Sequence, residues 1–395
     1  MTNFAHYYNS RKMLILEKPY VSEKLIQTAI ENNLPVLRNA MSEQLVEKGY
    51  ALNLYNDEEF IAEYEKHHRI YTMSENALGW IVEKLPDEEL KKKIELLKNK
   101  ATFRRICKDM YPDFFFQEVA IEEMPKMDVS TLRFPLVLKP SVGFLSAGVY
   151  VVHTVEEWKT AVDDIQSNFR KVGNQFPEYV VGTQYFLLEE YIKGEEYAVD
   201  AYFDENGQPV IWNIYHHRFA NESDTSDRLY CSSRKLFDQY EAPFMDFLKQ
   251  INKVIQLRDF PMHIEFRYDG RRAIPIEINP LRFAGFCLNE LQTHISGIHP
   301  IVAYLNNIHI TKEEMWKGKE NDTYNFLVLE RPTGAAKEQQ FNCEKFKASV
   351  MDVLELRPLA DPTVGVAATA FTRTDAAHEA EFDFILNLDM KDFMK

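Results

Sequence analysis

The sequence predicts an α/β fold in which an N-terminal, doubly wound parallel unit precedes units of antiparallel strands. Between residues 12 and 82, short apolar runs alternate with helical patterns, which is the order that parallel sheets require. Between about 100 and 300, strand patterns are joined in pairs by short turns. Residues 320–395 hold two strand patterns, YNFLVLE and VGVAATAF, and a helical pattern, KFKASVMDVLE, which predict a small C-terminal α+β unit.

The composition is that of a globular chain with an acidic surface. A length of 395 residues exceeds one ordinary core and predicts about two to four packed units. Acidic residues number 61 and basic residues 46, which gives a net charge of -15. Because that charge repels phosphodiester backbones, nucleic-acid binding is not expected. A small polyanion could still bind in a local basic pocket.

Neither membrane insertion nor secretion is expected from the sequence. No apolar run approaches the roughly 18 residues of a membrane span, and the N-terminus lacks the apolar segment of a signal peptide. The cysteines are widely spaced and form no CxxC pair, so we expect reduced thiols in a cytoplasmic protein rather than a zinc site. They are Cys107, Cys231, Cys287 and Cys343.

Each element of the N-terminal unit has its own pattern. Strands are expected in KMLILE, PVLRNA, YALNLY and RIYTMS, and helices in SEKLIQTAIENN and DEEFIAEYEKHH. Ser22 is a candidate N-cap of the first helix, because its hydroxyl can accept a backbone N–H bond. No G-x-G-x-x-G turn follows the first strand, so a dinucleotide site is not expected. The charged helix predicted at 87–99 is interpreted as a solvated face or a linker.

Residues 134–152, FPLVLKPSVGFLSAGVYVV, are predicted to form two strands joined by a small, polar turn. Lys139 ends the first strand, and the turn holds Gly143, Ser146 and Gly148. Backbone N–H groups of such a turn, with the serine hydroxyl and the lysine ammonium, can bind a phosphate. The Lys-Ser/Thr pair of a Walker A motif is missing after Gly148. The alternative is an ordinary hairpin whose lysine extends to water.

Residues 262–280, MHIEFRYDGRRAIPIEINP, predict a hairpin whose strands each have a polar and an apolar face. The apolar positions on both sides of the Asp-Gly turn are even-numbered and must share one buried face. A turn centred just after Asp-Gly then places Glu265 opposite Glu277. The same register places His263 opposite Asn279, and a shift by two residues would keep the shared face.

Opposed carboxylates destabilise a strand pair unless a cation lies between them. Two carboxylates and an amide oxygen, with room for phosphate oxygens and water, suit Mg²⁺ or Mn²⁺. One alternative is an acid–base carboxylate pair of the kind that hydrolyses glycosides, which leaves Asn279 and the phosphate-binding turn without a role. The other is ordinary surface charge.

Residues 186–197, FLLEEYIKGEEY, predict a strand that leaves its sheet and turns at Gly194. Free backbone N–H and C=O groups in such a segment can bind the edge of an adenine ring, and a carboxylate a few residues later can accept both ribose hydroxyls. The alternative is a plain acidic loop.

These three segments, in this order, resemble the ATP-grasp superfamily over roughly residues 12–300. The most specific feature is the E-x-N at 277–279 that follows a glutamate, Glu265, on the preceding strand. The resemblance implies a two-lobed ATP-grasp domain with antiparallel sheets behind an N-terminal α/β unit. The expected domains are 1–99, 100–192 (small nucleotide lobe), 193–318 (large lobe with the metal site) and 319–395.

The resemblance also implies roles for individual residues. Lys100 and Lys139 would contact the ATP phosphates, and the 143–148 turn would close over them. The adenine slot would be lined by Glu189, Glu190 and Ile192, the ribose held by Glu196, and Mg²⁺ or Mn²⁺ held by Glu265, Glu277 and Asn279.

The sequence departs from the family pattern at two places. Phe144 and Leu145 lie in the middle of the turn, where many relatives have glycine, which predicts a stiffer turn or an apolar lid. An arginine often follows E-x-N-P at once in the family, whereas here Leu281 intervenes. Arg282 is expected to stabilise the charge that develops during transfer.

The activity implied is that of an ADP-forming carboxylate–amine ligase, in which ATP converts a carboxylate to an acyl phosphate that an amine attacks. His216 and His217 are candidates for a base or a substrate contact, or are surface histidines at a strand end. The expected partners are ATP, a small carboxylate and a small amine, with a homodimer as a further option. The alternatives are a nucleotide-binding regulatory protein without turnover and a phosphotransferase acting on a hydroxyl.

Overall fold

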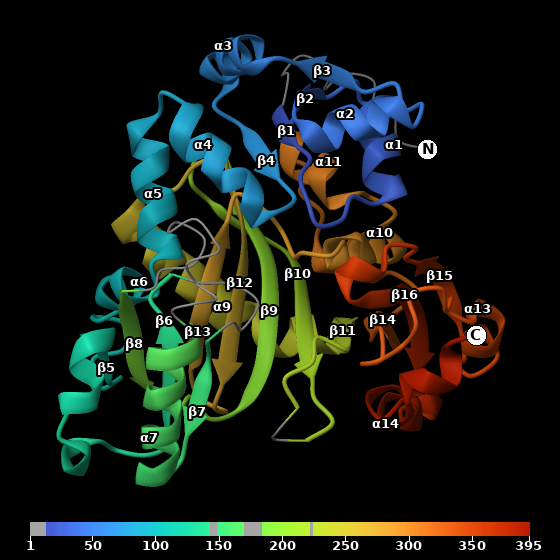
Figure 1. The fold of residues 1–395 in the computed structure, drawn as a ribbon. Helices are drawn as coiled ribbons and strands as arrows, with labels where there is room; N and C mark the ends of the chain where they lie inside the picture. The colour runs from blue at the N-terminus through green and yellow to red at the C-terminus, as the bar shows by residue number, and fades with distance from the viewer. Residues whose placement is uncertain (1–12, 143–147, 170–183, 222–223) are drawn as a thin grey trace.

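The computed structural model describes residues 13–142, 148–169, 184–221 and 224–395 (Figure 1). Its N-terminal unit is a four-stranded parallel sheet in the order β3-β2-β1-β4, which confirms the predicted fold class there. The strands are β1 (Met13–Ile15), β2 (Pro35–Leu37), β3 (Asn53–Tyr55) and β4 (Ile70–Thr72), and the helices are α1 (Glu23–Glu31), α2 (Ala40–Glu47), α3 (Asp57–His67) and α4 (Leu78–Lys84).

Side-chain caps determine where these helices begin. The Ser22 hydroxyl accepts a hydrogen bond from a backbone N–H of α1 at 3.0 Å, which confirms the predicted N-cap. Capping boxes at Asn39 and Asn56 start α2 and α3. Helix α2 is absent from the predicted elements, because only two of its eight residues are buried and its apolar periodicity is correspondingly weak.

Helix α5 (Glu88–Lys98) confirms the helix predicted at 87–99, but its interpretation as a solvated face or linker is incomplete. Leu90, Ile94 and Leu97 are buried, and the helix packs against β13 (Ala273–Pro280). Figure 1 shows α5 running from the N-terminal unit toward α6 (Lys100–Ile106). The helix therefore brings the N-terminal unit into contact with a strand far along the chain.

The small lobe is an antiparallel sheet in the order β5-β8-β6-β7, with α7 (Val155–Asp164) against one face. Strands β6 and β7 pair antiparallel, which confirms the strand–turn–strand arrangement predicted at 134–152. Of the turn, Gly143 and Ser146 lie outside the described residues. The strands are β5 (Phe116–Ala120), β6 (Leu136–Pro140), β7 (Tyr150–Val152) and β8 (Tyr185–Glu190).

An eight-stranded sheet in the order β13-β12-β9-β10-β11-β14-β16-β15 forms the centre of the molecule. Helix α9 (Arg234–Ile255) covers one face, where Phe244 stacks on Phe266 with ring centroids 4.7 Å apart. The other face carries the polar residues considered below. The strands are β9 (Glu195–Phe203), β10 (Pro209–Arg218), β11 (Leu229–Ser233), β12 (Phe260–Tyr268), β13, β14 (Asp322–Glu330), β15 (Val353–Pro358) and β16 (Val366–Asp375).

The C-terminal residues extend this sheet. Strand β14 pairs with β11, so the α+β unit expected at 319–395 is hydrogen-bonded to the preceding unit, at the right of Figure 1. The boundaries expected between the four domains stay predictions. Among the described residues, no helix combines the length and apolarity that crossing a bilayer demands. The remaining helices are α10 (Leu291–Ser296), α11 (Pro300–Leu305), α12 (Lys312–Met315), α13 (Cys343–Lys347) and α14 (Ala380–Leu386).

Candidate active site

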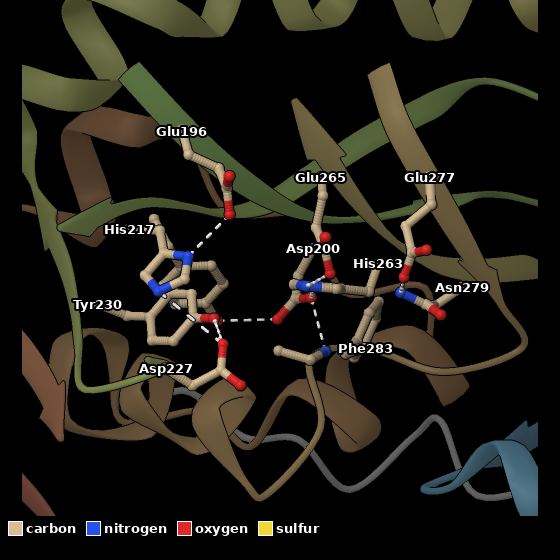
Figure 2. A network of polar contacts seen from close by, with 12 residues as sticks. Glu196, Asp200, His217, Asp227, Tyr230, His263, Glu265, Glu277, Asn279 and Phe283 are labelled. Carbon is tan, nitrogen blue, oxygen red and sulfur yellow. Dashed lines mark hydrogen bonds and ion pairs between the residues drawn. The ribbon is translucent and has the colours of Figure 1, made fainter. Parts of the chain in front are cut away.

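The predicted register of the carboxylate hairpin is confirmed. Glu265 of β12 pairs with Glu277 of β13, and His263 pairs with Asn279. A bulge after Glu265 shifts the register by one residue on the side of the hairpin turn. The predicted pairing, in which opposed residues have numbers that are both even or both odd, therefore holds only for the pairs farther from the turn. Figure 2 shows the carboxylates of Glu265 and Glu277 projecting from neighbouring strands on the same side of the sheet.

The two carboxylates have different electrostatic surroundings. Burial, and then repulsion by Glu277, raise the pKa of Glu265 well above its ordinary value of 4.5. Burial acts in the same direction on Glu277, but Lys100 outweighs it and lowers the pKa of Glu277 to about 2. The Nζ of Lys100 lies 2.7 Å from Oε2 of Glu277. Lys100 therefore keeps Glu277 ionised, and the repulsion between the two carboxylates contributes to the raised pKa of Glu265.

The donor set fits a magnesium ion that is shared with a phosphate-bearing ligand. Mg²⁺ usually takes one or two carboxylates, and substrate phosphates and waters complete its shell. Glu265, Glu277 and the Asn279 amide offer that number of oxygen donors. In the described part of the chain, no three His, Cys, Asp or Glu side chains cluster as a metal cage. The residues thus suit an ion that arrives with its nucleotide.

A buried network holds the β12 strand in place beside the carboxylates (Figure 2). Asp200 of β9 is fully buried, and its Oδ1 lies 2.8 Å from Nδ1 of His263. Its Oδ2 accepts the hydroxyl of Tyr215 at 2.8 Å, and its Oδ1 also accepts the backbone N–H of Ala284 at 2.8 Å. Asp200 therefore links three strands of the sheet to the segment that follows β13.

Lys139 points from the small lobe toward β13, where a second cation joins it. Its Nζ lies 2.5 Å from Oε1 of Glu189 and 3.4 Å from the backbone oxygen of Ile276. Arg104 binds the other oxygen of Glu189 at 2.7 Å and the backbone oxygen of Pro275 at 2.5 Å. Both oxygens of Glu189 are thus engaged by cations, and Lys139 is held at the face of the small lobe that meets β13.

Gly148 lies shortly before β7 in a conformation that glycine tolerates best. Its φ is +75°, and a Cβ at this position would come within 2.4 Å of the Phe169 ring. The glycine therefore allows the chain to pass close to the core of the small lobe as it enters β7.

Glu196 and His217 form a pair on the polar face of the large sheet. Nδ1 of His217 lies 2.8 Å from Oε1 of Glu196, and Arg267 binds Oε2 of Glu196 at 3.2 Å. The His217 ring also stacks on Tyr230, with centroids 4.2 Å apart. His216 lies on the opposite face, where its ring stacks on Tyr197, so the structure brings only one of the two histidines to this surface.

The hinge residues Glu190 and Ile192 lie where the small lobe leaves its sheet. The carboxylate of Glu190 accepts the backbone N–H of Phe115 at 3.4 Å. Ile192 is buried in a small apolar cluster with Phe114 and Ile274 of β13. Ile192 therefore contributes to apolar packing between the two lobes.

Leu281 turns the chain directly after β13, and Arg282 follows this turn. The φ of Leu281 is +60°, its N–H donates to Pro261 O at 2.8 Å, and its carbonyl accepts the N–H of Thr72 at 2.8 Å. Arg282 then binds Oε1 of Glu75 at 3.0 Å. The site thus reaches the N-terminal unit through Glu75, which the sequence did not indicate.

Sequence reasoning missed several residues of this site. Asp200 had a visible signal, because it is an acidic residue inside the apolar strand AVDAYF. No pattern in the sequence marks Arg104 or Glu75. Their contacts depend on the way that α6 and the end of β4 lie beside β13 in the folded chain.

The comparisons with known proteins agree with this geometry. Residues 132–290 match the model of the ATP-grasp domain. The fold is similar to an L-amino acid ligase from Bacillus licheniformis, with a TM-score of 0.72 and 15% identity over 98% of each chain. No curated protein matches the sequence.

Two further solved structures share the fold. An N5-carboxyaminoimidazole synthase from Aspergillus clavatus, in complex with ADP and a ribonucleotide, has a TM-score of 0.65 and 13% identity over 95% of this chain and 97% of that chain. A biotin carboxylase from Campylobacter jejuni has a TM-score of 0.61 and 14% identity over 92% and 87%.

Residues 132–290 therefore match the ATP-grasp domain that the sequence resemblance predicted. ATP-grasp enzymes use ATP and Mg²⁺, which confirms the predicted cofactors.

Proposed function

We propose that this protein is an ATP-dependent ligase that joins a carboxylate to an amine and releases ADP and phosphate. The observation that carries the proposal is the opposed pair of Glu265 and Glu277, with Lys100 bound to one of them and Lys139 on the facing lobe. Paired carboxylates beside lysines suit a triphosphate with its metal ion. The similarity to an L-amino acid ligase supports an amide as the product.

The proposed metal ligands are Glu265, Glu277 and Asn279. When bound, Mg²⁺ supplies the positive charge that neutralises the phosphates. The protein's own contribution is to fix the two carboxylates at one register of the sheet, with Asp200 holding His263 of the same strand. Lys100, which is bound to Glu277 in this structure, would contact a phosphate oxygen.

The proposed nucleotide site lies between the two lobes. Val137 and Val151 pair on the face of the small lobe that also carries Glu189, and Val151 is 44% exposed. An exposed apolar side chain beside buried cations suits an adenine ring next to its phosphates. We assign the adenine edge to the segment of Glu189, Glu190 and Ile192, the ribose to Glu196, and the phosphates to Lys100, Lys139 and the turn of Gly143, Ser146 and Gly148.

The proposed reaction has two balanced steps. A carboxylate oxygen forms a bond to the γ-phosphorus while the bond to the β-phosphate oxygen breaks and ADP leaves. The amine nitrogen then attacks the acyl carbon, the bond to the phosphate oxygen breaks, and the amine gives up a proton. Arg282 would stabilise the transferred charge, and His217, which lies on the polar face of the sheet, is a better candidate than His216 for a substrate contact.

The test combines the purified protein with Mg·ATP and pooled L-amino acids, with ADP release and product masses as readouts. We expect ADP, phosphate and an amide product, and we expect Glu277→Gln to abolish ADP release while the protein stays folded. A phosphorylated hydroxyl product, nucleotide binding without any product, or full activity of the variant would each contradict the proposal.

A further inference from the structure

Two cations donate hydrogen bonds to the outer edge of β13. This strand is the last of the eight-stranded sheet and pairs only with β12, so the backbone oxygens of its outer edge need other partners. Arg104 of α6 donates to the oxygen of Pro275 at 2.5 Å. Lys139 of β6 donates to the oxygen of Ile276 at 3.4 Å. Residues next to and within the small lobe therefore bind two successive oxygens of the large sheet.

The bulge in the carboxylate hairpin explains how two successive oxygens can face the same side. In a regular strand, the oxygens of neighbouring residues point to opposite edges. Here Glu277 pairs with Glu265 and Pro275 pairs with Phe266, so Ile276 is an extra residue without a partner on β12. Such a bulge bends the strand and redirects its groups. It thus presents both oxygens to cations from the other lobe.

Arg104 joins the two lobes through one guanidinium group. Its Nε donates to Oε2 of Glu189 on β8 at 2.7 Å, and its Nη1 donates to Pro275 on β13. The guanidinium lies over the ring of Phe114, 4.6 Å from the centroid. Arg104 is 3% exposed, and its Nη2 is buried without a partner in the described part of the chain. Because the guanidinium is planar and rigid, its two bonds fix the carboxylate of Glu189 relative to β13.

Glu189 passes this constraint to Lys139. Its other oxygen, Oε1, lies 2.5 Å from Nζ of Lys139, and the two side chains are 3% and 4% exposed. The ammonium is therefore held by one acceptor from each lobe, the Glu189 carboxylate and the Ile276 oxygen. Arg104 does not contact Lys139 through a hydrogen bond of its own, so its effect on the lysine passes through the carboxylate that they share.

The charges near this lysine balance one another. Glu189 binds the lysine and Arg104, and Lys100 binds Glu277. Glu265 lies opposite Glu277, and burial followed by repulsion from Glu277 raises its pKa. Three cations thus face three carboxylates. An excess of positive charge does not account for the arrangement, whereas the directions of the hydrogen bonds do.

We propose that Arg104 is a positioning residue for nucleotide binding. By holding Glu189 against the bulge of β13, it sets the direction in which Lys139 presents its ammonium to the phosphates. Arg104 does not touch the nucleotide and acts through Lys139. This inference rests on the nucleotide site of the proposed function, and it is independent of the amide-forming step.

The first experiment measures the binding of Mg·ADP to the whole protein by calorimetry. Arg104→Lys keeps the charge, but an ammonium cannot reproduce the two fixed directions of a guanidinium. We expect Arg104→Lys to weaken ADP binding about threefold or more. Lys139→Met, which removes the phosphate contact itself, should weaken it about tenfold or more. ADP affinity of Arg104→Lys equal to that of the unmodified protein would overturn the proposal.

The second experiment combines the two substitutions. Because Arg104 acts through Lys139, adding Arg104→Lys to Lys139→Met should change ADP affinity by less than about twofold. Losses that simply multiply would show that Arg104 acts on the nucleotide by another route, which would overturn the proposal. A thermal shift shows whether each variant folds, and Arg104→Gln replaces Arg104→Lys if the latter does not.

Arg105→Lys is the matched control. Arg105 is the next residue of α6, is 54% exposed and pairs with Glu118, so we expect its substitution to leave ADP affinity unchanged. Equal weakening in Arg105→Lys and Arg104→Lys would trace the effect to a loosened helix and contradict positioning. A protein that binds Mg·ADP but forms no amide would reject only the ligase. An unmodified protein that does not bind Mg·ADP would reject both the nucleotide site and the role of Arg104.

Discussion

At the scale of single residues, the site repeats one arrangement: a buried glutamate shared by two cations. Glu189 is shared by Lys139 and Arg104, and Glu75 is shared by Lys98 and Arg282. Removing the carboxylate from such a group leaves two like charges buried without compensation. The glutamates are therefore as important to the position of the cations as the backbone that carries them.

Glu189→Gln should destabilise the protein strongly. Its side chain is 3% exposed and holds Lys139 and Arg104, so we expect a loss of about 3–5 kcal/mol in the free energy of unfolding. Chemical denaturation measures this loss. Glu123→Gln is the control, because Glu123 forms an exposed pair with Lys126 and should change stability by less than about 1 kcal/mol. Similar small effects in both variants would contradict the account.

At the scale of elements, two glycines with nearly the same backbone conformation distinguish the cost of a left-handed backbone from the cost of crowding by a neighbouring side chain. Gly148 and Gly365 have φ values of +75° and +74°. A Cβ on Gly148 would meet the Phe169 ring at 2.4 Å, whereas a Cβ on Gly365 would meet nothing within 4 Å. The chain at Gly148 is therefore restricted by contact with the Phe169 ring as well as by its backbone conformation.

Substituting alanine at both glycines tests this difference. Gly365→Ala should cost about 1–2 kcal/mol from the left-handed backbone alone. Gly148→Ala should cost about 1–3 kcal/mol more, because the added methyl group crowds Phe169. Urea denaturation of the two variants gives the difference directly. Equal losses would show that the ring moves aside at no cost.

The sequence predicts elements and register well where one face of a strand is buried. The pairing of Glu265 with Glu277 follows from a period of two and a single apolar face. The bulge after Glu265 was not predicted, although Pro275 beside it is a signal, because proline lacks the N–H that a regular ladder uses. Pairs such as Lys139 with Glu189 could not be predicted either, since they depend on how separate strands approach each other.

At the scale of the whole molecule, the segment after β13 joins the N-terminal and C-terminal parts. Glu290 is buried and accepts a hydrogen bond from Ser22, the N-cap of α1. It also binds Arg357 of β15 at 2.7 Å. Together with Glu75, these contacts connect both ends of the described chain to the carboxylate hairpin.

The protein should lose stability in acid. Glu75, Glu189, Glu277 and Glu290 have pKa values below the ordinary 4.5, because cations or hydrogen bonds outweigh their burial. Their contribution is present above 4.5 and is lost as the pH falls through the lower folded values, about 2 for Glu277. Glu265 acts in the opposite sense, because its pKa is raised.

Denaturation midpoints measured between pH 7 and pH 3 test this dependence. We expect the free energy of unfolding to fall below about pH 4.5, and to fall less steeply in Glu189→Gln, which lacks one of the four groups. Constant stability down to pH 3, or the same slope in the variant, would contradict the assignment.

The most direct test of the central claim is Mn²⁺ binding by electron paramagnetic resonance, with and without ADP. If two opposed glutamates hold a divalent ion beside a nucleotide, Glu265→Gln and Glu277→Gln should each weaken Mn²⁺ binding in the presence of ADP. The expected loss is about tenfold or more in affinity, which corresponds to about 1.4 kcal/mol. Mn²⁺ affinity equal to that of the unmodified protein in both variants, with ADP still bound, would show that the carboxylate pair serves another purpose.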